Sequence, residues 1–154
     1  ITRLLMKRKG VSISYALDRF DNAIRLADVI VAHNLTFDKN MLIVEAYRLS
    51  RPNFFTTSGS GSGSGSGVKE HCTMKANIKR CNIVRERANS TRYLKYPRLS
   101  ELHDTLFNYI PKGTHNAMAD VLICLRCYLF IEFNKDIATT PNLYVTKLFK
   151  LYCC

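Results

Sequence analysis

An α/β fold with a parallel sheet is the architecture that the sequence predicts, and three observations carry that prediction. The run Val29-Ile30-Val31-Ala32 is short, β-branched and unalternating, as is typical of a strand that a parallel sheet buries on both faces. Amphipathic helical patterns lie on both sides of this run, over residues 14–27 and 36–49. Two more helical patterns follow a second strand candidate at 70–74. In such a layout, side chains that do chemistry gather at the C-terminal ends of the strands.

The two helices around the first strand are predicted from apolar residues spaced three or four apart. In the first helix, Ser14 is the expected N-cap. Pro52 bars extension of the second helix, because proline lacks the N–H that an interior turn needs. We expect these helices to bury Tyr15, Leu17, Phe20, Ile24 and Ala27 in the first, and Phe37, Met41, Val44 and Tyr47 in the second.

The second half of the chain is less regular. The segment EHCTM (70–74) is a weak strand candidate, residues 78–84 are left unassigned, and residues 85–98 resemble a basic loop. Pro97 and Ser100 mark the start of a helix that is closed by Pro111 and Gly113 and places Leu99, Leu102, Leu106 and Ile110 on one side. A last helix over 116–133 is expected to turn Ala117, Val121, Leu125, Tyr128 and Leu129 inward, and residues 134–154 form a tail that either packs on the domain or docks a partner.

Residues 58–67 repeat the dipeptide Ser-Gly five times, a regularity that natural low-complexity segments rarely show. We interpret them as an engineered flexible linker that replaces a native loop and carries no function. The chain of 154 residues is then one domain in two parts, 1–57 and 68–133, joined by the linker and followed by the tail 134–154.

The charge of the chain is strongly basic, with 23 Lys and Arg against 12 Asp and Glu, or a formal +11. A polyanion such as nucleic acid is the partner this favours, although a basic surface without a partner has the same composition. The excess of basic residues is concentrated between Lys69 and Arg98, and Tyr93 and Tyr96 lie within that stretch. Such a stretch either contacts phosphates and stacks on bases or is a solvated loop. The candidate contacts to a nucleic-acid backbone are Lys75, Lys79, Arg80, Arg85, Arg87 and Arg92.

Six cysteines are read as reduced thiols, because no signal peptide is visible and the chain is too apolar to need disulfide staples. An intracellular location, cytoplasm or nucleus, is therefore expected. Cys124 and Cys127 form a Cys-x-x-Cys inside an apolar helical pattern, which favours buried thiols over a metal site. His71 and His103 are expected to be packing or surface residues. No run of about 18 apolar residues is present, so no membrane contact is expected.

Two short segments pair a histidine with an aspartate near a helix start. His33 and Asn34 end the first strand, and Asp38 follows in the first helical turn, where it either holds a divalent cation or complements the helix dipole. His115 and Asp120 repeat this arrangement in HNAMAD. Five residues rotate a regular helix by about 500°, so His115 must lie on the preceding loop to reach Asp120. An imidazole held beside a metal-bound water is suited to act as a general base.

These segments resemble motifs of a known family. AHNLTFDKNML is similar to the second motif, and HNAMAD to the third, of the DEDDh 3′–5′ exonucleases, the DnaQ-like group with RNase T on an RNase H-like fold. The stretches GVSISYALDRF, CTM and PRLSELHDTLF extend the resemblance. It implies hydrolysis of 3′-terminal phosphodiesters of DNA or RNA with two Mg²⁺ or Mn²⁺ ions. Asp38 and Asp120 would bind metal, His115 would be the catalytic base, and His33, Asn34 and Phe37 would shape the pocket for the terminal nucleotide.

The chain departs from this family in one respect: no Asp-x-Glu, the family's first motif, occurs in it. The N-terminal antiparallel strands that carry this motif are expected to be lacking, which leaves two strands with an unpaired edge. We interpret the chain as a fragment whose sheet is completed by a further protein segment. The alternatives are a catalytically dead nucleic-acid-binding module or an assembly element on the same fold.

Overall fold

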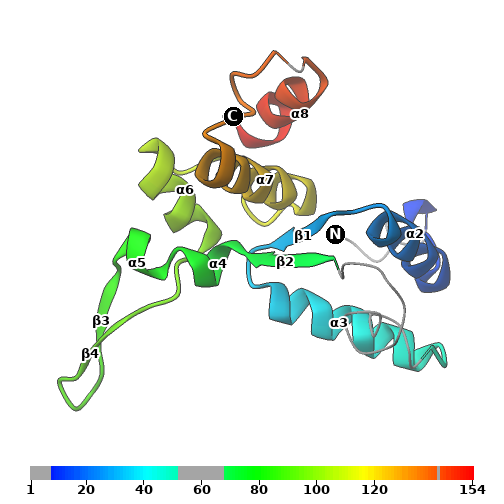
Figure 1. Cartoon of the computed structure of the whole chain (residues 1–154), viewed down its shortest axis with the longest axis horizontal. Helices are drawn as coiled ribbons and strands as arrows, with labels where there is room; N and C mark the ends of the chain where they lie inside the picture. The colour runs from blue at the N-terminus through cyan, green and yellow to red at the C-terminus, as the bar shows by residue number, and fades with distance from the viewer. Residues whose placement is uncertain (1–7, 52–67, 142) are drawn as a thin grey trace. The chain divides into compact units, whose positions relative to one another are not determined.

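The computed structural model describes residues 8–51, 68–141 and 143–154 (Figure 1). Residues 58–67, which the sequence analysis interpreted as a linker, lie outside the described residues. Within them the chain is a mixture of helices and short strands, as the α/β prediction requires. It divides into two compact units, which we call unit 1 (residues 1–30 and 36–70) and unit 2 (residues 31–35 and 71–154).

The elements of unit 1 are few. Helix α2 spans Ile13–Arg25, and helix α3 spans Leu35–Arg48, of which only the first residue belongs to unit 2. The short strands β1 (Val29–Ala32) and β2 (Lys69–Cys72) both run from unit 1 into unit 2. Unit 2 continues with α4 (Thr73–Ala76), α5 (Ile78–Cys81), β3 (Val84–Glu86), β4 (Arg92–Leu94), α6 (Leu99–Phe107), α7 (Ala117–Phe133) and α8 (Leu143–Cys153).

Helix α2 begins one residue earlier than predicted, and its cap is Ser12 rather than Ser14. The Ser12 side chain accepts the backbone N–H of Tyr15 at 3.2 Å, because Ser12 has the extended backbone that an N-cap requires. Ser14 lies inside the helix, where its Oγ accepts a hydrogen bond from Arg51. Arg51 also pairs with Asp18, so the end of α3 is tied to α2 within unit 1.

Strand β1 has the predicted bounds, but its predicted burial on both faces is wrong. All four residues are only half-buried, because β1 has a single strand partner, β2, among the described residues. The N–H of Lys69 donates to the carbonyl of Asp28 at the start of both strands, and the Thr73 hydroxyl donates to the carbonyl of Ala32 just past their ends. The starts are thus adjacent and so are the ends, which makes the pair parallel, as predicted.

The predicted inward face of α3 is also wrong. Phe37, Met41, Val44 and Tyr47 are exposed, with Phe37 and Tyr47 at 60% and 61%, whereas Ala46 is buried. Spacing identifies an apolar stripe on a helix, but it does not supply the layer that covers the stripe. Among the described residues no such layer covers this one.

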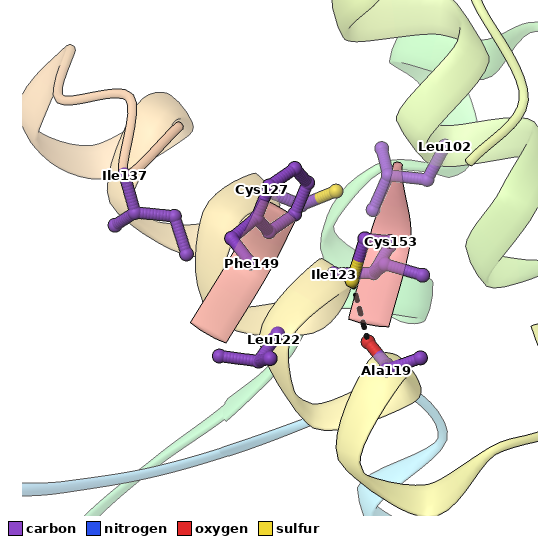
Figure 2. Close-up of a cluster of buried hydrophobic side chains, with 8 residues drawn as sticks. All are labelled: Leu102, Ala119, Leu122, Ile123, Cys127, Ile137, Phe149 and Cys153. Atoms are coloured by element: carbon purple, nitrogen blue, oxygen red, sulfur yellow. Dashed lines mark hydrogen bonds between the residues drawn. The ribbon is translucent and has the colours of Figure 1, made fainter. Parts of the chain in front are cut away.

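The core of unit 2 is formed by α6, α7 and α8 (Figure 2). Phe149 of α8 is fully buried against α7, so the tail packs on its own unit rather than remaining irregular. Figure 2 shows the Cys153 thiol donating to the carbonyl of Ala119 at 3.8 Å. The core residues are Leu102, Ala119, Leu122, Ile123, Cys127, Ile137, Phe149 and Cys153.

Helix α7 starts where predicted, yet its inward face is only partly as predicted. Leu125 and Leu129 pack against the core, Tyr128 is half-buried, and Val121 and Ala117 are exposed. A helix that is apolar almost all round has no single face that periodicity can select. Cys124 and Cys127 are buried free thiols, as predicted.

Helix α6 ends before Pro111 and Gly113, the residues that were predicted to close it. Glu101 accepts the N–H of Arg98 at 2.7 Å and so closes the N-terminus. Asn108 takes a left-handed conformation (φ 59°) and ends the helix three residues before Pro111. Ile110 therefore lies outside the helix and is 67% exposed.

The segment read as a basic loop is an antiparallel hairpin. Strands β3 and β4 pair with the register Val84–Leu94, Arg85–Tyr93 and Glu86–Arg92. The unassigned stretch before it contains α5 and the first residue of β3. Charged strands of three residues carry no apolar alternation, which is why the sequence pattern did not indicate them.

A buried guanidinium organises the interior of unit 2. Arg126 is 5% exposed and makes two hydrogen bonds of 2.7 Å to the carboxylate of Asp136. It also donates to the hydroxyl of Tyr109 and, at 3.0 Å, to Nε2 of His103. The Arg126 guanidinium lies 3.7 Å from the centre of the Phe107 ring, within cation–π range.

The protonation of this cluster follows from its donors and acceptors. A guanidinium only donates, so Nε2 of His103 accepts and its Nδ1–H donates to the carbonyl of Tyr109 at 3.0 Å. Burial and the charge of Arg126 lower the pKa of His103, consistent with a neutral ring. Burial alone would raise the pKa of Asp136, but its hydrogen bonds from Arg126 lower it overall. His103 is a packing residue, as predicted.

None of the helices in the described part of the chain has both the length and the apolar character needed to cross a bilayer.

Candidate functional site

The first histidine–aspartate segment begins where β1 ends. Asn34 has a left-handed backbone (φ 77°), a conformation that asparagine tolerates better than most residues, and it turns the chain from β1 into α3. The His33 ring lies between two protein groups, with Nδ1 3.0 Å from the Thr73 hydroxyl and Nε2 2.9 Å from the carbonyl of Pro97. A carbonyl only accepts, so Nε2–H of His33 is the donor to Pro97. His33 therefore links the end of β1, the start of α4 and the segment before α6 inside unit 2.

Beside His33, backbone N–H groups converge on the Cys72 thiol. Burial raises the pKa of Cys72, but hydrogen bonds from the backbone of Lys75, Leu35 and Asn34 lower it overall. These N–H groups come from the turn after β1 and the start of α4. The sequence analysis gave Cys72 no role of its own, and its only signals were a place in the middle of the strand candidate 70–74 and in the CTM stretch of the resemblance.

Asp38 and Phe37 lie in the first turn of α3, where the sequence placed them. Both are exposed, Phe37 at 60%. They belong to unit 1, whereas His33, Asn34, His115 and Asp120 belong to unit 2, and each is placed within its own unit.

The second histidine–aspartate segment is built around the start of α7. Asn116 is the N-cap, and its side-chain oxygen accepts the N–H of Met118 at 3.0 Å and of Ala119 at 3.4 Å. His115 precedes the cap with a left-handed backbone (φ 75°), so it lies on the loop, as predicted. Its backbone N–H donates to Oδ1 of Asp120, in the first turn of α7, at 3.3 Å. His115 is exposed and Asp120 half-exposed, which leaves both accessible to a ligand.

The loop that carries His115 contacts the C-terminal end of α8. Gly113 has φ 73°, and a Cβ added there would lie 2.2 Å from the carbonyl oxygen of Tyr152. The N–H of Lys112 donates to the carbonyl of Cys153 at 3.2 Å. Only glycine fits this approach, so α8 fixes the path of the loop into His115. The sequence analysis treated Gly113 as a helix stop and missed this contact.

The six basic candidates for nucleic-acid contacts are all exposed and all belong to unit 2. Arg92 pairs with Glu86 across the hairpin at 3.8 Å, and Arg80 donates to the side chain of Asn77. Their positions are Lys75 on α4, Lys79 and Arg80 on α5, Arg85 on β3, Arg87 in the hairpin turn and Arg92 on β4.

The carboxylates that the sequence analysis named as metal ligands are Asp38 in unit 1 and Asp120 in unit 2. Hard divalent cations take carboxylate oxygens, and two ions need several carboxylates. Asp38 and Asp120 supply two, and the Asp-x-Glu pair is absent from the sequence. Over the described ranges no group of three or more His, Cys, Asp or Glu side chains is gathered in a way that could hold a metal. The described residues thus supply two of the carboxylates that a two-ion site needs, one in each unit, and do not gather them into a complete set.

Comparison of the chain with protein-family models, with curated proteins and with solved structures gave no match. The case for a function therefore rests on the two motifs and on where the structure places them.

Proposed function

We propose that this chain is part of a metal-dependent 3′–5′ exonuclease, a hydrolase that removes nucleotides from 3′ ends of DNA or RNA. The observation that supports the proposal most directly is the placement of His115 on the loop before α7, joined through its backbone to the carboxylate of Asp120. A histidine and an acid at one helix start are the groups that a base and a metal ligand require.

His115 is the proposed general base. Its backbone N–H is anchored to Asp120, so the exposed imidazole can accept a proton from a water bound near that carboxylate. Gly113 and the cap at Asn116 hold the loop on either side, which limits the positions that the ring can sample. The backbone that carries the proposed base is thus held in place, which is one part of orienting it for proton transfer.

Asp38 and Asp120 are the proposed ligands of Mg²⁺ or Mn²⁺. When bound, such ions activate water and stabilise the negative charge that develops on the phosphate. The remaining carboxylates would come from a further protein segment that adds strands to the parallel pair β1–β2 and completes an RNase H-like sheet. Such an addition would also satisfy the open edge of this sheet.

The terminal nucleotide is proposed to bind near Asn34 and Phe37. The exposed ring of Phe37 offers a stacking surface for a base. His33 would act indirectly, because both of its ring nitrogens already contact Thr73 and Pro97. The exposed basic residues would contact the phosphates of the strand that leads to the 3′ end.

The second candidate is a nucleic-acid-binding module without catalysis. The incomplete carboxylate set favours it, and so does the exposed basic hairpin β3–β4. It predicts binding with a steep salt dependence and no requirement for a divalent cation.

A time course on a 5′-labelled single-stranded oligonucleotide tests the proposal, with DNA and RNA in parallel and with Mn²⁺ or EDTA. We expect a ladder that shortens from the 3′ end only when metal is present. Asp120→Asn should weaken Mn²⁺ binding by at least about tenfold, whereas Asp104→Asn, an exposed acid on α6, should not. Binding of the oligonucleotide without any shortening in Mn²⁺ would reject nuclease activity of this chain on its own and support the binding module.

A further inference from the structure

The β3–β4 hairpin has two chemically different faces, because side chains alternate along a strand. Arg85 and Tyr93 are directly opposite one another in the register and share one face. The guanidinium of Arg87 lies 5.1 Å from the centre of the Tyr93 ring, so Arg87 extends the same face. We call the surface formed by Arg85, Arg87 and Tyr93 the arginine–tyrosine face.

The opposite face is apolar and electrically balanced. Val84 and Leu94 form one cross-strand pair, and Glu86 and Arg92 form an ion pair with 3.8 Å between their charged atoms. Glu86, the acidic residue of strands β3 and β4, thus lies on this opposite face. Over the described parts of the chain, Arg85 and Arg87 make no ion pair, so the arginine–tyrosine face carries two positive charges and an exposed aromatic ring.

The root of the hairpin is fixed to unit 2 at several points. The backbone N–H of Lys95 donates to the carbonyl of Ile83 at 2.8 Å, and its ammonium group pairs with Glu101 of α6 at 2.6 Å. Burial raises the pKa of Glu101, but the N–H of Arg98 and the charge of Lys95 lower it overall, which keeps this pair ionised. Pro97 is held by His33. The β3–β4 hairpin, whose ribbon Figure 1 shows, is therefore anchored at its root and carries the arginine–tyrosine face.

We infer that the arginine–tyrosine face binds a single strand of nucleic acid, with a base stacked on Tyr93 and the neighbouring phosphates contacted by Arg85 and Arg87. The charges alone would suit any polyanion. The exposed Tyr93, with Arg87 at its ring and Arg85 across the strand, adds a stacking surface, and an unpaired strand offers the faces of its bases along its whole length. The inference rests on the proposed function for the identity of the strand, which would be the one whose 3′ end enters the site.

Fluorescence anisotropy with a short labelled single strand and its duplex, in EDTA so that nothing is cleaved, tests this inference. We expect the single strand to bind more tightly than the duplex. Tyr93→Ala should weaken single-strand binding about tenfold, while Tyr93→Phe, which keeps the ring, should bind like the parent. The matched control is Tyr144→Ala, since Tyr144 is a 72% exposed tyrosine on α8, and it should leave binding unchanged.

The salt dependence tests the two arginines separately. Each of Arg85→Ala and Arg87→Ala should reduce the slope of log K against log salt by about 0.7, the value for one phosphate contact on a single strand. Parent-like binding by Tyr93→Ala, or equal binding of a polyglutamate peptide, would overturn the inference in favour of a nonspecific basic surface.

The outcome is separable from that of the exonuclease proposal. Asp104→Asn should bind the single strand like the parent in EDTA, because Asp104 lies on α6, outside both the hairpin and the proposed catalytic site. Tyr93-dependent binding without metal-dependent shortening would reject the nuclease and keep the single-strand surface. Metal-dependent shortening that is indifferent to Tyr93→Ala, in binding and in rate, would reject the surface and keep the nuclease.

Discussion

The backbone N–H of His115 donates to Oδ1 of Asp120 at 3.3 Å, which joins the two residues of the HNAMAD motif across the start of α7. The bond uses the backbone of the histidine and leaves its imidazole for chemistry. It depends on the left-handed conformation of His115, which turns its N–H back towards the first helical turn. Residues five apart do not share a face of a regular helix, so the contact requires His115 to lie on the loop before α7.

Gly113→Ala is expected to destabilise the chain by more than about 1 kcal/mol, because alanine disfavours φ 73° and its Cβ would lie 2.2 Å from the carbonyl of Tyr152. Any nuclease activity should fall as well, since the loop into His115 must shift. Urea denaturation and the oligonucleotide time course measure the two effects. Gly10→Ala is the control, because Gly10 is exposed and lies outside α2. Equal effects of the two substitutions would contradict the role given to the Tyr152 contact.

Arg126→Ala is expected to reduce the free energy of unfolding by about 3 kcal/mol or more, because it leaves the partly buried carboxylate of Asp136 without its partner. The exposed pair Arg25–Asp21 supplies the control, and Arg25→Ala should cost no more than about 0.5 kcal/mol. Chemical denaturation of the two variants under one buffer condition makes the comparison. A small effect at Arg126 would show that the cluster does not hold α6 and α7 together.

Acidification is expected to destabilise the fold through His103. The pKa of His103 is lowered in the folded state, so the unfolded chain binds more protons as the pH falls below about 6.5. The contribution of His103 to the free energy of unfolding is complete above that pH, and it is lost as the pH falls towards the pKa of His103 in the folded state. Denaturant midpoints at about pH 7.5 and about pH 5.5 should therefore differ, and His103→Gln should reduce the difference. An unchanged pH dependence in His103→Gln would assign the effect to other groups.

The thiols are expected to react with iodoacetamide in an order set by their surroundings. Cys72 should be modified before Cys127 and Cys153, because backbone N–H groups lower the pKa of Cys72. Burial raises the pKa of Cys127, and burial with the neighbouring Cys154 raises that of Cys153 to about 11. Peptide mapping by mass spectrometry at mildly alkaline pH measures the order. Faster modification of Cys127 than of Cys72 would contradict it.

Features that depend on nearby residues could be predicted from the sequence. The bounds of β1 follow from a β-branched run between polar residues, and the start of α7 follows from Asn116 and the apolar residues after it. The position of His115 outside that helix follows from the same local signal. These predictions need no knowledge of what the elements pack against.

Features that depend on distant partners could not be predicted in the same way. The contact of Gly113 with Tyr152 joins residues 39 positions apart (152 − 113), and nothing near either residue signals it. The exposed stripe containing Phe37 has the spacing of a buried face, because spacing does not record whether a covering layer is present. The hairpin was missed for a different reason: its strands carry charge where alternating apolar residues would have revealed them.

The oligonucleotide time course in Mn²⁺, run on the parent chain and on His115→Ala side by side, tests the assignment of function most directly. We expect the parent to shorten the labelled strand from its 3′ end, and His115→Ala to lose this activity while keeping the parent's circular dichroism spectrum and denaturation midpoint. Undiminished shortening by a folded His115→Ala would contradict the assignment of His115 as the general base. The absence of shortening by the parent would contradict nuclease activity of this chain on its own and would leave the missing carboxylates to the further protein segment.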